Sequence, residues 1–310
     1  MKVVVPERMR PHLGSLPSDM ETAWYEGVDG CVASVRDAEV LWADFNVKHM
    51  ESVLEAGASI HWVTTDVAGV DRWPLDLLAL RRVILTNGAG LQATPISEYV
   101  VMALLAGLKG FTELAEAQRR RQWLPKPPAF GEMDHKRALI YGYGNIGRAI
   151  GERLRAFGVS VIGVRRHPTG EASVVADTEW ERYLPETDLL ILAVPLTGAT
   201  RALVGEPELA ALPRGAWVVN IARGALIDEA ALIGALKSGH LGGAYLDVTE
   251  TEPLPHESEL WLLPTVILTP HSSWASDRLD GAAGGMFLDN LDRYRRGEPL
   301  RNVVDLQAGY

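Results

Sequence analysis

The chain has 310 residues, enough for two domains with separate cores, and 47% of them are hydrophobic, as in ordinary globular proteins. Its formal net charge of −10 argues against a nucleic-acid-binding protein, which would present a basic surface. The single cysteine, Cys31, excludes an internal disulfide and a cysteine-based metal site, and no stretch is long and apolar enough to span a membrane. We therefore expect a cytoplasmic protein without a metal ion and without nucleic-acid or membrane partners.

The first part of the chain shows short apolar runs that predict strands. The predicted strands are residues 1–6, 31–35, 38–43, 60–65 and 83–88. Between the third and the fourth, residues 46–57 have the apolar spacing of an amphipathic helix that ends at Gly57. A longer helical pattern runs roughly from Pro95 to Trp123 and leads into a charged, proline-rich connection at the surface.

A second series of strands begins after this connection. The predicted strands are residues 137–142, 159–165, 188–194, 216–222, 242–248 and 265–270, and helical patterns separate the first five. Residues 277–296 form a last helical pattern with one polar face. Because strands and helices alternate, we expect an α/β protein with parallel sheets in two layered domains.

The segment ALIYGYGNIGRAIGERLRAFG places Gly142, Gly144 and Gly147 in the spacing G-x-G-x-x-G. The motif follows a predicted strand, opens an amphipathic helix and leads to a second strand, which is the context of a dinucleotide-binding site. Gly142 permits a tight turn, Gly144 lets the backbone approach a pyrophosphate, and Gly147 lets the helix pack closely on the strand. The N-terminus of the helix supplies N–H donors for the phosphates.

The end of the next strand indicates which dinucleotide is bound. An NAD enzyme usually carries Asp or Glu there for the ribose 2′-hydroxyl, whereas this chain carries Arg165 and Arg166. Guanidinium groups pair with a 2′-phosphate, so NADP(H) is favoured and NAD(H) stays possible. The alternative is that both arginines are solvated turn residues.

Three residues with complementary chemistry follow strands of the second series. Arg223, Glu252 and His271 stand at or just beyond carboxyl ends of strands, where open α/β sheets bind ligands. Histidine can donate a proton near neutral pH, a carboxylate favours the imidazolium, and an arginine can hold a carboxylate and polarise the neighbouring carbonyl. Taken singly, each could be structural: an ion pair, a loop acid or a core histidine. Together, and behind a dinucleotide motif, they predict the reduction of a 2-oxo acid.

Five segments then resemble one family, the D-isomer-specific 2-hydroxyacid dehydrogenases. They are GYGNIG, VPLTGAT, NIARGALIDEAAL, LDVTETEPLP and TPHSS, in the family's order over nearly the whole chain. The resemblance implies two doubly wound parallel-sheet domains, with a Rossmann dinucleotide-binding domain inserted in a flavodoxin-like substrate domain. We expect the dinucleotide-binding domain at residues 93–276 and the substrate domain at residues 1–92 and 277–310.

The resemblance also implies roles for individual residues. Arg223 would bind the 2-oxo acid, His271 would be the acid and base, and Glu252 would pair with His271. Asp247 would face the nicotinamide carboxamide. The other cofactor contacts that it implies are Gly142, Gly144, Asn145, Ile146, Gly147, Arg165, Arg166, Pro195, Thr200, Ile221 and Ala222. The segment DVAGVD resembles the loop whose N–H groups hold the substrate carboxylate, which points to Ala68 and Gly69.

Three residues in these loops leave alternatives open. Asp66 stands just before Ala68, where an acid would disfavour an anionic substrate unless it turns away or is neutralised. Tyr143 stands inside the glycine motif, and one interpretation is that its ring covers the pyrophosphate. Trp274 either packs in a core or borders the substrate.

The sequence therefore predicts NADPH-dependent reduction of a small 2-oxo acid, of the glyoxylate or hydroxypyruvate type, to the D-2-hydroxy acid. An NAD-dependent dehydrogenase of a bulkier 2-hydroxy acid is the alternative among enzymes, and a dinucleotide-sensing corepressor is the alternative outside them. The resemblance also implies a homodimer joined through the dinucleotide-binding domain. The helical pattern after Pro95 is a candidate interface, because it has more apolar surface than one buried face needs.

Overall fold

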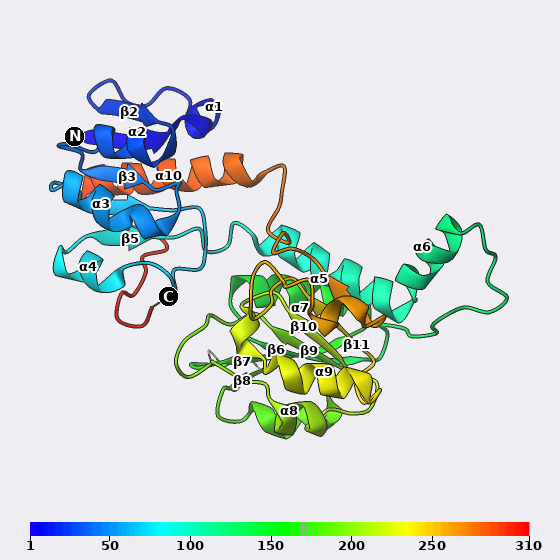
Figure 1. The fold of residues 1–310 in the computed structure, drawn as a ribbon. Helices are drawn as coiled ribbons and strands as arrows, with labels where there is room; N and C mark the ends of the chain where they lie inside the picture. Colours follow the sequence, from blue (N-terminus) through cyan, green and yellow to red (C-terminus); the bar gives the residue numbers. More distant parts are fainter. Residues whose placement is uncertain (169, 172, 310) are drawn as a thin grey trace. The chain divides into compact units, whose positions relative to one another are not determined.

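The computed structural model describes residues 1–168, 170–171 and 173–309, and the chain divides into two compact units (Figure 1). Unit 1 combines Met1–Gln92 with the segment from Ser276 onward, and unit 2 is Ala93–Ala275. Each unit contains one sheet, and all neighbouring strands within these two sheets are parallel. The α/β class with two parallel sheets, predicted from the sequence, is confirmed.

The sheet of unit 1 has the strand order β2-β1-β3-β4-β5, which is the order of flavodoxin-like folds. Its strands are β1 (Lys2–Pro6), β2 (Glu21–Tyr25), β3 (Val40–Trp42), β4 (Trp62–Thr64) and β5 (Ile84–Thr86). Its helices are α1 (Arg10–Leu13), α2 (Gly27–Ser34), α3 (Met50–Ala56), α4 (Leu75–Leu80) and α10 (Leu279–Arg296), with short 3₁₀ turns η1 (Glu7–Met9) and η2 (Val47–His49). After α10 the chain returns to the edge of this sheet, where Val303 forms a bridge with Thr86.

Side chains of unit 1 alternate between the two faces of its sheet, because successive residues of a strand point in opposite directions. Val4 and Leu41 belong to the apolar cluster that includes the buried residues of α2, α3 and α4. Val40 and Trp62 belong to the cluster on the other face, under α10. There Trp62 stacks on Phe287 with ring centroids 5.6 Å apart. The last helix is therefore part of the core of unit 1.

Two predictions about unit 1 were wrong. Residues 31–35, predicted as a strand, belong mostly to α2, where Cys31 and Val35 are buried one helical turn apart. Burial raises the pKa of the Cys31 thiol to about 12, so this cysteine is an unreactive core residue. The missing strand is β2, an edge strand that pairs only with β1. Because an edge strand buries little side-chain surface, its apolar signal in the sequence is weak.

The sheet of unit 2 has the strand order β12-β11-β10-β9-β6-β7-β8. Its strands are β6 (Arg137–Tyr141), β7 (Ser160–Arg165), β8 (Val174–Ala176), β9 (Leu189–Leu192), β10 (Trp217–Asn220), β11 (Gly243–Leu246) and β12 (Val266–Leu268). Its helices are α5 (Ala93–Leu108), α6 (Phe111–Arg119), α7 (Asn145–Ala156), α8 (Glu206–Ala211) and α9 (Glu229–Lys237), with 3₁₀ turns η3 (Trp180–Glu186), η4 (Gly224–Leu226) and η5 (Glu259–Leu262). From β8 to β11 this is the Rossmann order, and the order reverses between β6 and β9.

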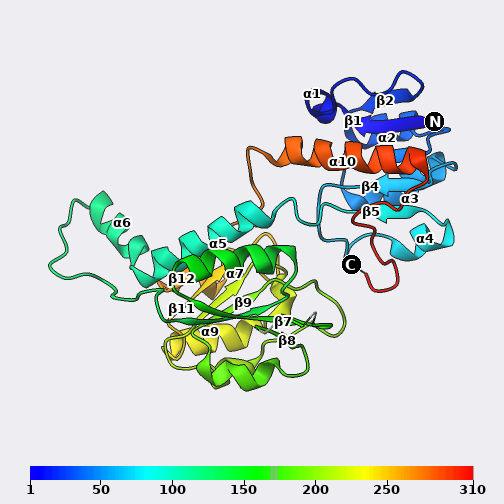
Figure 2. The same cartoon turned by 180° about the vertical axis from the view of Figure 1, so that it is seen from behind.

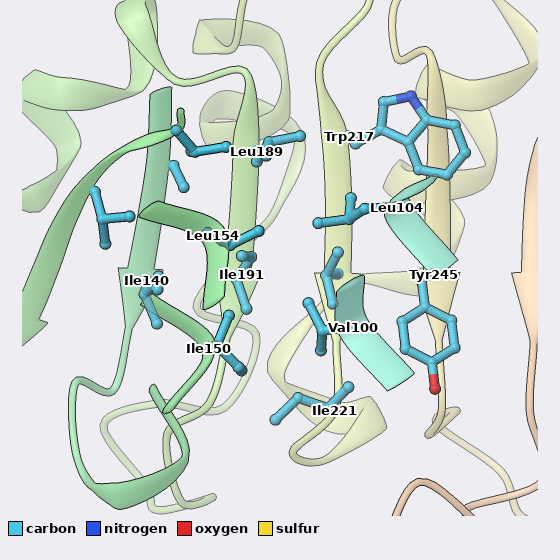
Figure 3. Packing of buried hydrophobic residues seen from close by; sticks show 14 of the residues in the cluster. Val100, Leu104, Ile140, Ile150, Leu154, Leu189, Ile191, Trp217, Ile221 and Tyr245 are labelled. Atoms are coloured by element: carbon cyan, nitrogen blue, oxygen red, sulfur yellow. The ribbon is translucent and has the colours of Figure 1, made fainter. Parts of the chain in front are cut away.

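Helices cover both faces of the sheet in unit 2 (Figure 2), and a cluster of apolar side chains lies on each face. On one face α5 and α7 pack on Ile140, Ile191 and their neighbours, as Figure 3 shows. On the other face α8 and α9 pack on the alternate strand residues, among them Leu139 and Leu190. Strands buried on both faces are near-continuous apolar runs, which is why the sequence identified the central strands of this sheet correctly.

The helical pattern from Pro95 to Trp123 forms two helices instead of one. Gly110 lies between α5 and α6 with a φ of 62°, a conformation that suits glycine. A Cβ at this position would lie 2.6 Å from the ring of Pro128. The chain therefore turns at Gly110. The short edge strand β8 was not predicted, and a 3₁₀ turn, η3, precedes β9 where a helix was expected.

Over the described ranges, no helix has both the length and the apolar character needed to cross a membrane. The same ranges hold no group of three or more His, Cys, Asp or Glu side chains that could bind a metal ion.

Candidate active site

The carboxyl ends of β10, β11 and β12 carry the residues that the sequence singled out in unit 2. These strands are neighbours in one parallel sheet. Arg223 follows β10, Glu252 lies in the loop after β11, and His271 follows β12. Side chains that reach the same edge from adjacent strands can act on one ligand.

Glu252 and His271 form a hydrogen-bonded pair. Nδ1 of His271 lies 2.9 Å from Oε2 of Glu252. The other oxygen of this carboxylate accepts the N–H of Thr249 at 3.3 Å, which restrains Glu252. Among the residues that the structure describes, none hydrogen-bonds Nε2 of His271. A ring that donates from Nδ1 to Glu252 has Nε2 available to give or take a proton.

The turn that carries His271 is held by Asp247, which is 2% exposed. Its carboxylate accepts hydrogen bonds from the N–H groups of Ser272 and Ser273, at 2.9 and 3.2 Å, and from the hydroxyls of Thr269 and Ser273, at 2.5 Å each. Its backbone oxygen accepts the N–H of His271 at 2.8 Å. A buried carboxylate is stable when so many donors surround it. Asp247 thus positions His271, and its contact with a nicotinamide carboxamide stays a prediction.

Arg223 is half-buried directly after β10, and its Nη1 donates to the backbone oxygen of Ala222 at 2.7 Å. The next residue, Gly224, lies against the loop that carries Glu252. A Cβ at position 224 would be 1.9 Å from the carbonyl carbon of Thr249. The absence of a side chain at Gly224 therefore lets the loops of Arg223 and Glu252 approach each other.

Trp274 lies beside His271 and not in a core. Its side chain is 45% exposed, and its indole N–H donates to the backbone oxygen of His271 at 2.8 Å. Of the two interpretations drawn from the sequence, the core position is therefore excluded. The contact of Trp274 with a substrate stays a prediction.

The three glycines of the G-x-G-x-x-G motif have different surroundings. A Cβ at Gly142 would lie 2.4 Å from the backbone oxygen of Ala193, and one at Gly147 would lie 2.4 Å from the backbone oxygen of Gly142. Gly142 also has a φ of 100°, which suits glycine. At Gly144, in contrast, a Cβ would meet no atom within 4 Å. Internal packing thus requires Gly142 and Gly147, whereas Gly144 leaves open space before α7.

The N-terminus of α7 has open hydrogen-bond donors. The N–H of Arg148 donates to the backbone oxygen of Gly144 at 2.9 Å. The described part of the chain supplies no acceptor for the N–H groups of Asn145, Ile146 and Gly147. Such groups, together with the positive end of the helix dipole, bind anions. The local structure therefore fits the pyrophosphate of a dinucleotide.

The interpretation that the ring of Tyr143 covers the pyrophosphate was wrong. The side chain is 3% exposed and lies in the core of unit 2. A Cβ at Gly163 would be 2.3 Å from this ring, and one at Gly151 would be 2.8 Å from its hydroxyl. That hydroxyl accepts a hydrogen bond from Arg155 at 2.9 Å. Two glycines outside the motif thus make room for the ring.

Arg165 is the last residue of β7, and Arg166 follows it. Because β7 pairs with β6, both lie at the same end of the sheet as the glycine motif. Arg165 is half-buried and Arg166 is exposed. This position agrees with the one from which a ribose phosphate is bound in Rossmann domains.

The remaining expected cofactor contacts lie in the loops after β9 and β10. The hydroxyl of Thr200 donates to the backbone oxygen of Pro195 and accepts the N–H of Thr197, both at 2.8 Å. Thr200 therefore shapes its own loop. Ile221 is buried in the core, and Ala222 is partly exposed. Contacts of these residues with a dinucleotide stay predictions.

Ala68 and Gly69 lie in the loop after β4, in unit 1. The side chain of Asn87 donates to the backbone oxygen of Ala68 at 2.8 Å, and the N–H of Gly88 donates to that of Val67 at 2.9 Å. These bonds fix the loop to the segment after β5. Within the described ranges, the N–H groups of Ala68 and Gly69 find no acceptor, so they are available to an anion.

Sequence reasoning missed several residues that shape these loops. Ser272 and Ser273 stand in the TPHSS segment, but only the fold shows that they bind Asp247. Gly224 follows Arg223 in the sequence, but the sequence does not show that its backbone contacts that of Thr249. Arg8, near the N-terminus, binds the carboxylate of Asp66.

Substituting Gly224 by alanine tests the packing between the two loops. The new Cβ would overlap the main chain at Thr249, so we expect a loss of about 1–3 kcal/mol in the free energy of unfolding. Chemical denaturation measures this change. The matched control is Gly234→Ala in α9, where a Cβ meets no atom within 4 Å and alanine is the better helix former. Equal stability of the Gly224 variant and the wild type would contradict the close approach.

Comparisons with known proteins agree with this architecture. Residues 101–273 match the family model described as D-isomer specific 2-hydroxyacid dehydrogenase, NAD binding domain. The chain is 32% identical to glyoxylate reductase from Pyrococcus furiosus, over 88% of this chain and 84% of that protein.

Two solved structures share the whole fold. One is a D-isomer specific 2-hydroxyacid dehydrogenase family protein from Aeromonas salmonicida, with a TM-score of 0.86 and 27% identity over 98% of this chain and 99% of that one. The other is an NADPH-dependent glyoxylate/hydroxypyruvate reductase from Sinorhizobium meliloti in complex with NADP and sulfate, with a TM-score of 0.83 and 28% identity over 100% and 99%. The predicted resemblance is thereby confirmed: the chain is an NAD(P)-dependent oxidoreductase that belongs to the D-isomer specific 2-hydroxyacid dehydrogenase family.

Proposed function

We propose that this protein uses NADPH to reduce a small 2-oxo acid, of the glyoxylate or hydroxypyruvate type, to the D-2-hydroxy acid. The observation that carries the proposal is the pair of His271 and Glu252 at the sheet edge that also bears Arg223. A carbonyl that becomes an alcohol needs a proton donor, and an imidazolium held by a carboxylate is suited to this task. The similarity to a glyoxylate reductase and to a glyoxylate/hydroxypyruvate reductase supports the substrate class.

The proposed dinucleotide site lies at the N-terminus of α7 and the end of β7. The N–H groups of Asn145, Ile146 and Gly147 would bind the pyrophosphate. Arg165 and Arg166 would pair with the 2′-phosphate that distinguishes NADPH from NADH. When bound, NADPH supplies the hydride for the reduction. The presence of NADP in the structure of the Sinorhizobium meliloti relative supports this choice of cofactor.

The proposed proton transfer uses both ring nitrogens of His271. Nδ1 keeps a proton in its hydrogen bond with Glu252, and Nε2 gives its proton to the carbonyl oxygen of the substrate. Glu252 stabilises the doubly protonated ring before the transfer. Arg223 would hold the substrate and polarise its carbonyl. In unit 1, the N–H groups of Ala68 and Gly69 would offer hydrogen bonds to a carboxylate, as the resemblance implies.

We further propose that a second copy of the chain covers the apolar surface of α6 and the segment after it. Figure 1 shows α6 extending away from the sheet of unit 2. The exposed fractions there are 60% for Phe111, 40% for Leu114, 96% for Trp123 and 78% for Phe130. Exposed large apolar side chains close together along the chain favour an interaction site, and a dimer is the commonest form among soluble homo-oligomers.

The first experiment compares NADPH with NADH as the reductant of glyoxylate, hydroxypyruvate and pyruvate, followed by the loss of reduced-nicotinamide absorbance. We expect faster turnover with NADPH. Replacing Arg165 and Arg166 together by serine should raise KM for NADPH about tenfold or more and leave NADH nearly unaffected, because only NADPH has the phosphate. Arg182→Ser, at an exposed arginine of η3, is the control.

Faster turnover with NADH would contradict the pairing of Arg165 and Arg166 with a 2′-phosphate, but it would still agree with a 2-oxo acid reductase. No turnover with any pair would reject the proposed substrate class. It would favour a bulkier 2-hydroxy acid or a protein that only senses the dinucleotide.

Substituting His271 by asparagine tests the proton donor. Loss of a general acid typically costs about 100-fold or more in turnover, so kcat should fall by that order while the dissociation constant of NADPH stays nearly constant. Glu252→Gln should give a smaller fall, because the ring remains but loses its charged partner. His135→Asn is the control, since its side chain is 92% exposed. Near wild-type kcat in the His271 variant would reject the assignment.

Sedimentation velocity tests the dimer. We expect the wild type to sediment with the mass of two chains of 33.8 kDa each. The variant with Trp123→Glu and Phe130→Glu should sediment as a monomer, because charges buried without partners in the interface oppose association. Leu262→Glu is the control, because this exposed apolar residue lies in η5 and not in the α6 surface. A monomeric wild type at micromolar concentration would contradict the proposal.

A further inference from the structure

An arginine that the proposed chemistry does not use sits among three carboxylates in unit 1. Nε of Arg8 lies 2.5 Å from Asp44, Nη1 lies 2.5 Å from Asp280, and Nη2 lies 2.5 Å from Asp66. These four residues, which we call the Arg8 cluster, are far apart in the sequence. A guanidinium has donors in a fixed fork and can bridge several carboxylates at once.

The Arg8 cluster lies at the carboxyl edge of the sheet in unit 1. Arg8 follows β1, Asp44 follows β3, Asp66 follows β4, and Asp280 belongs to the first turn of α10. The strand order of this sheet reverses between β1 and β3. In open α/β sheets, such a switch point at the carboxyl edge is where ligands bind.

Asp66 leads directly into the loop with the open N–H groups of Ala68 and Gly69. Consecutive Cα atoms are about 3.8 Å apart, so the Cα of Asp66 is at most about 11 Å from that of Gly69. This upper limit is comparable to the screening length of about 8 Å at physiological salt, and the carboxylate of Asp66, which is only 13% exposed, is screened less than an exposed charge. An unpaired carboxylate at Asp66 would therefore repel an anion bound by the loop.

The main chain holds Asp66 in place beside this loop. Its backbone oxygen accepts a hydrogen bond from the side chain of Gln92 at 3.3 Å. A Cβ at Gly88 would lie 2.0 Å from the same oxygen, so the two segments are in close contact. These contacts hold the backbone of Asp66 beside the loop, and its carboxylate is bound by Arg8, so the ion pair with Arg8 offsets the charge of Asp66.

The three carboxylates of the Arg8 cluster do not depend on Arg8 equally. The side chain of Asp66 is 13% exposed, whereas those of Asp44 and Asp280 are 33% and 43% exposed. Water and ions screen the two more exposed charges. The carboxylate of Asp66 is the least exposed of the three, so its charge depends most on the ion pair with Arg8.

We propose that Arg8 is a positioning residue for substrate binding: by holding and neutralising Asp66, it allows the loop of Ala68 and Gly69 to accept the carboxylate of a 2-oxo acid. This inference rests on the proposed function. It assigns to a residue near the N-terminus a share of the affinity for an anionic substrate. The effect should appear in KM and inhibitor binding, because Arg8 acts before and not during the chemical step.

The test measures KM and kcat for glyoxylate with NADPH, and the dissociation constant of oxalate in the presence of NADP, in a set of variants. Arg8→Met should raise KM and the oxalate dissociation constant about tenfold or more, with a much smaller change in kcat. The dissociation constant of NADPH should stay nearly constant. Arg10→Met is the matched control, because Arg10 is 53% exposed and pairs only with Glu7 among the carboxylates of the described chain.

A second substitution separates the charge of Asp66 from the general loss of ion pairs. Asp66→Asn added to Arg8→Met should restore most of the oxalate affinity, although the bonds of Arg8 to Asp44 and Asp280 stay broken. Asp44→Asn added to Arg8→Met should restore much less. Equal recovery in both double variants, or no recovery with Asp66→Asn, would overturn the proposal.

If Arg8→Met fails to fold, the single variant Asp66→Asn provides the test. In the otherwise wild-type protein, Asp66→Asn should leave KM unchanged or lower it, because a negative charge near the anion is removed. A KM raised tenfold in this variant would overturn the proposal.

Measurements on the wild-type protein distinguish failure of the proposed function from failure of the role of Arg8. If it neither reduces glyoxylate nor binds oxalate, the proposed function fails, and the role of Arg8 fails with it. If the wild type is active and Arg8→Met behaves like Arg10→Met, only the role of Arg8 is rejected.

Discussion

The geometry of the candidate active site depends on the hydrogen bonds that the buried carboxylate of Asp247 accepts. A carboxylate removed from water needs donors on all sides, and the chain meets this need by bringing Ser272 and Ser273 to it. His271 lies in the chain between β12 and these two serines, so the hydrogen bonds of the serines to Asp247 also position the backbone of His271. Thr269 links the network to Tyr245 of β11, at 2.9 Å. The interior of the sheet thus fixes the histidine, while Glu252 fixes its ring.

Close main-chain approaches give the edge of the sheet in unit 2 the rest of its form. The backbone at Gly224 touches the backbone at Thr249, and the backbone at Gly147 touches that at Gly142. In both places a side chain would fill the space that the contact uses. The loop of Arg223 and the N-terminus of α7 are therefore located by contacts between backbones, which tolerate less adjustment than contacts between flexible side chains.

The charges near each loop matter more for an anionic substrate than the net charge of −10. At the edge of unit 2, Arg223 supplies positive charge, and Glu252 lies within hydrogen-bond distance of His271. At the edge of unit 1, three carboxylates surround a single arginine. An acidic protein can bind an anion when its local charges are arranged for it, because screening limits distant charges.

The amino-acid sequence by itself determined the features that are local in the chain. The central strands of unit 2 are buried on both faces and read as apolar runs, and the glycine spacing marks the start of α7. The edge strands β2 and β8 were missed, and the short apolar run at residues 31–35 was assigned wrongly, because strand and helix share such runs. Only the tertiary structure decided the direction of Tyr143, the donors of Asp247 and the partners of Arg8, since each joins segments from different parts of the chain. Which polar groups must pair is set by the fold, because the cost of an unpaired charge depends on what surrounds it.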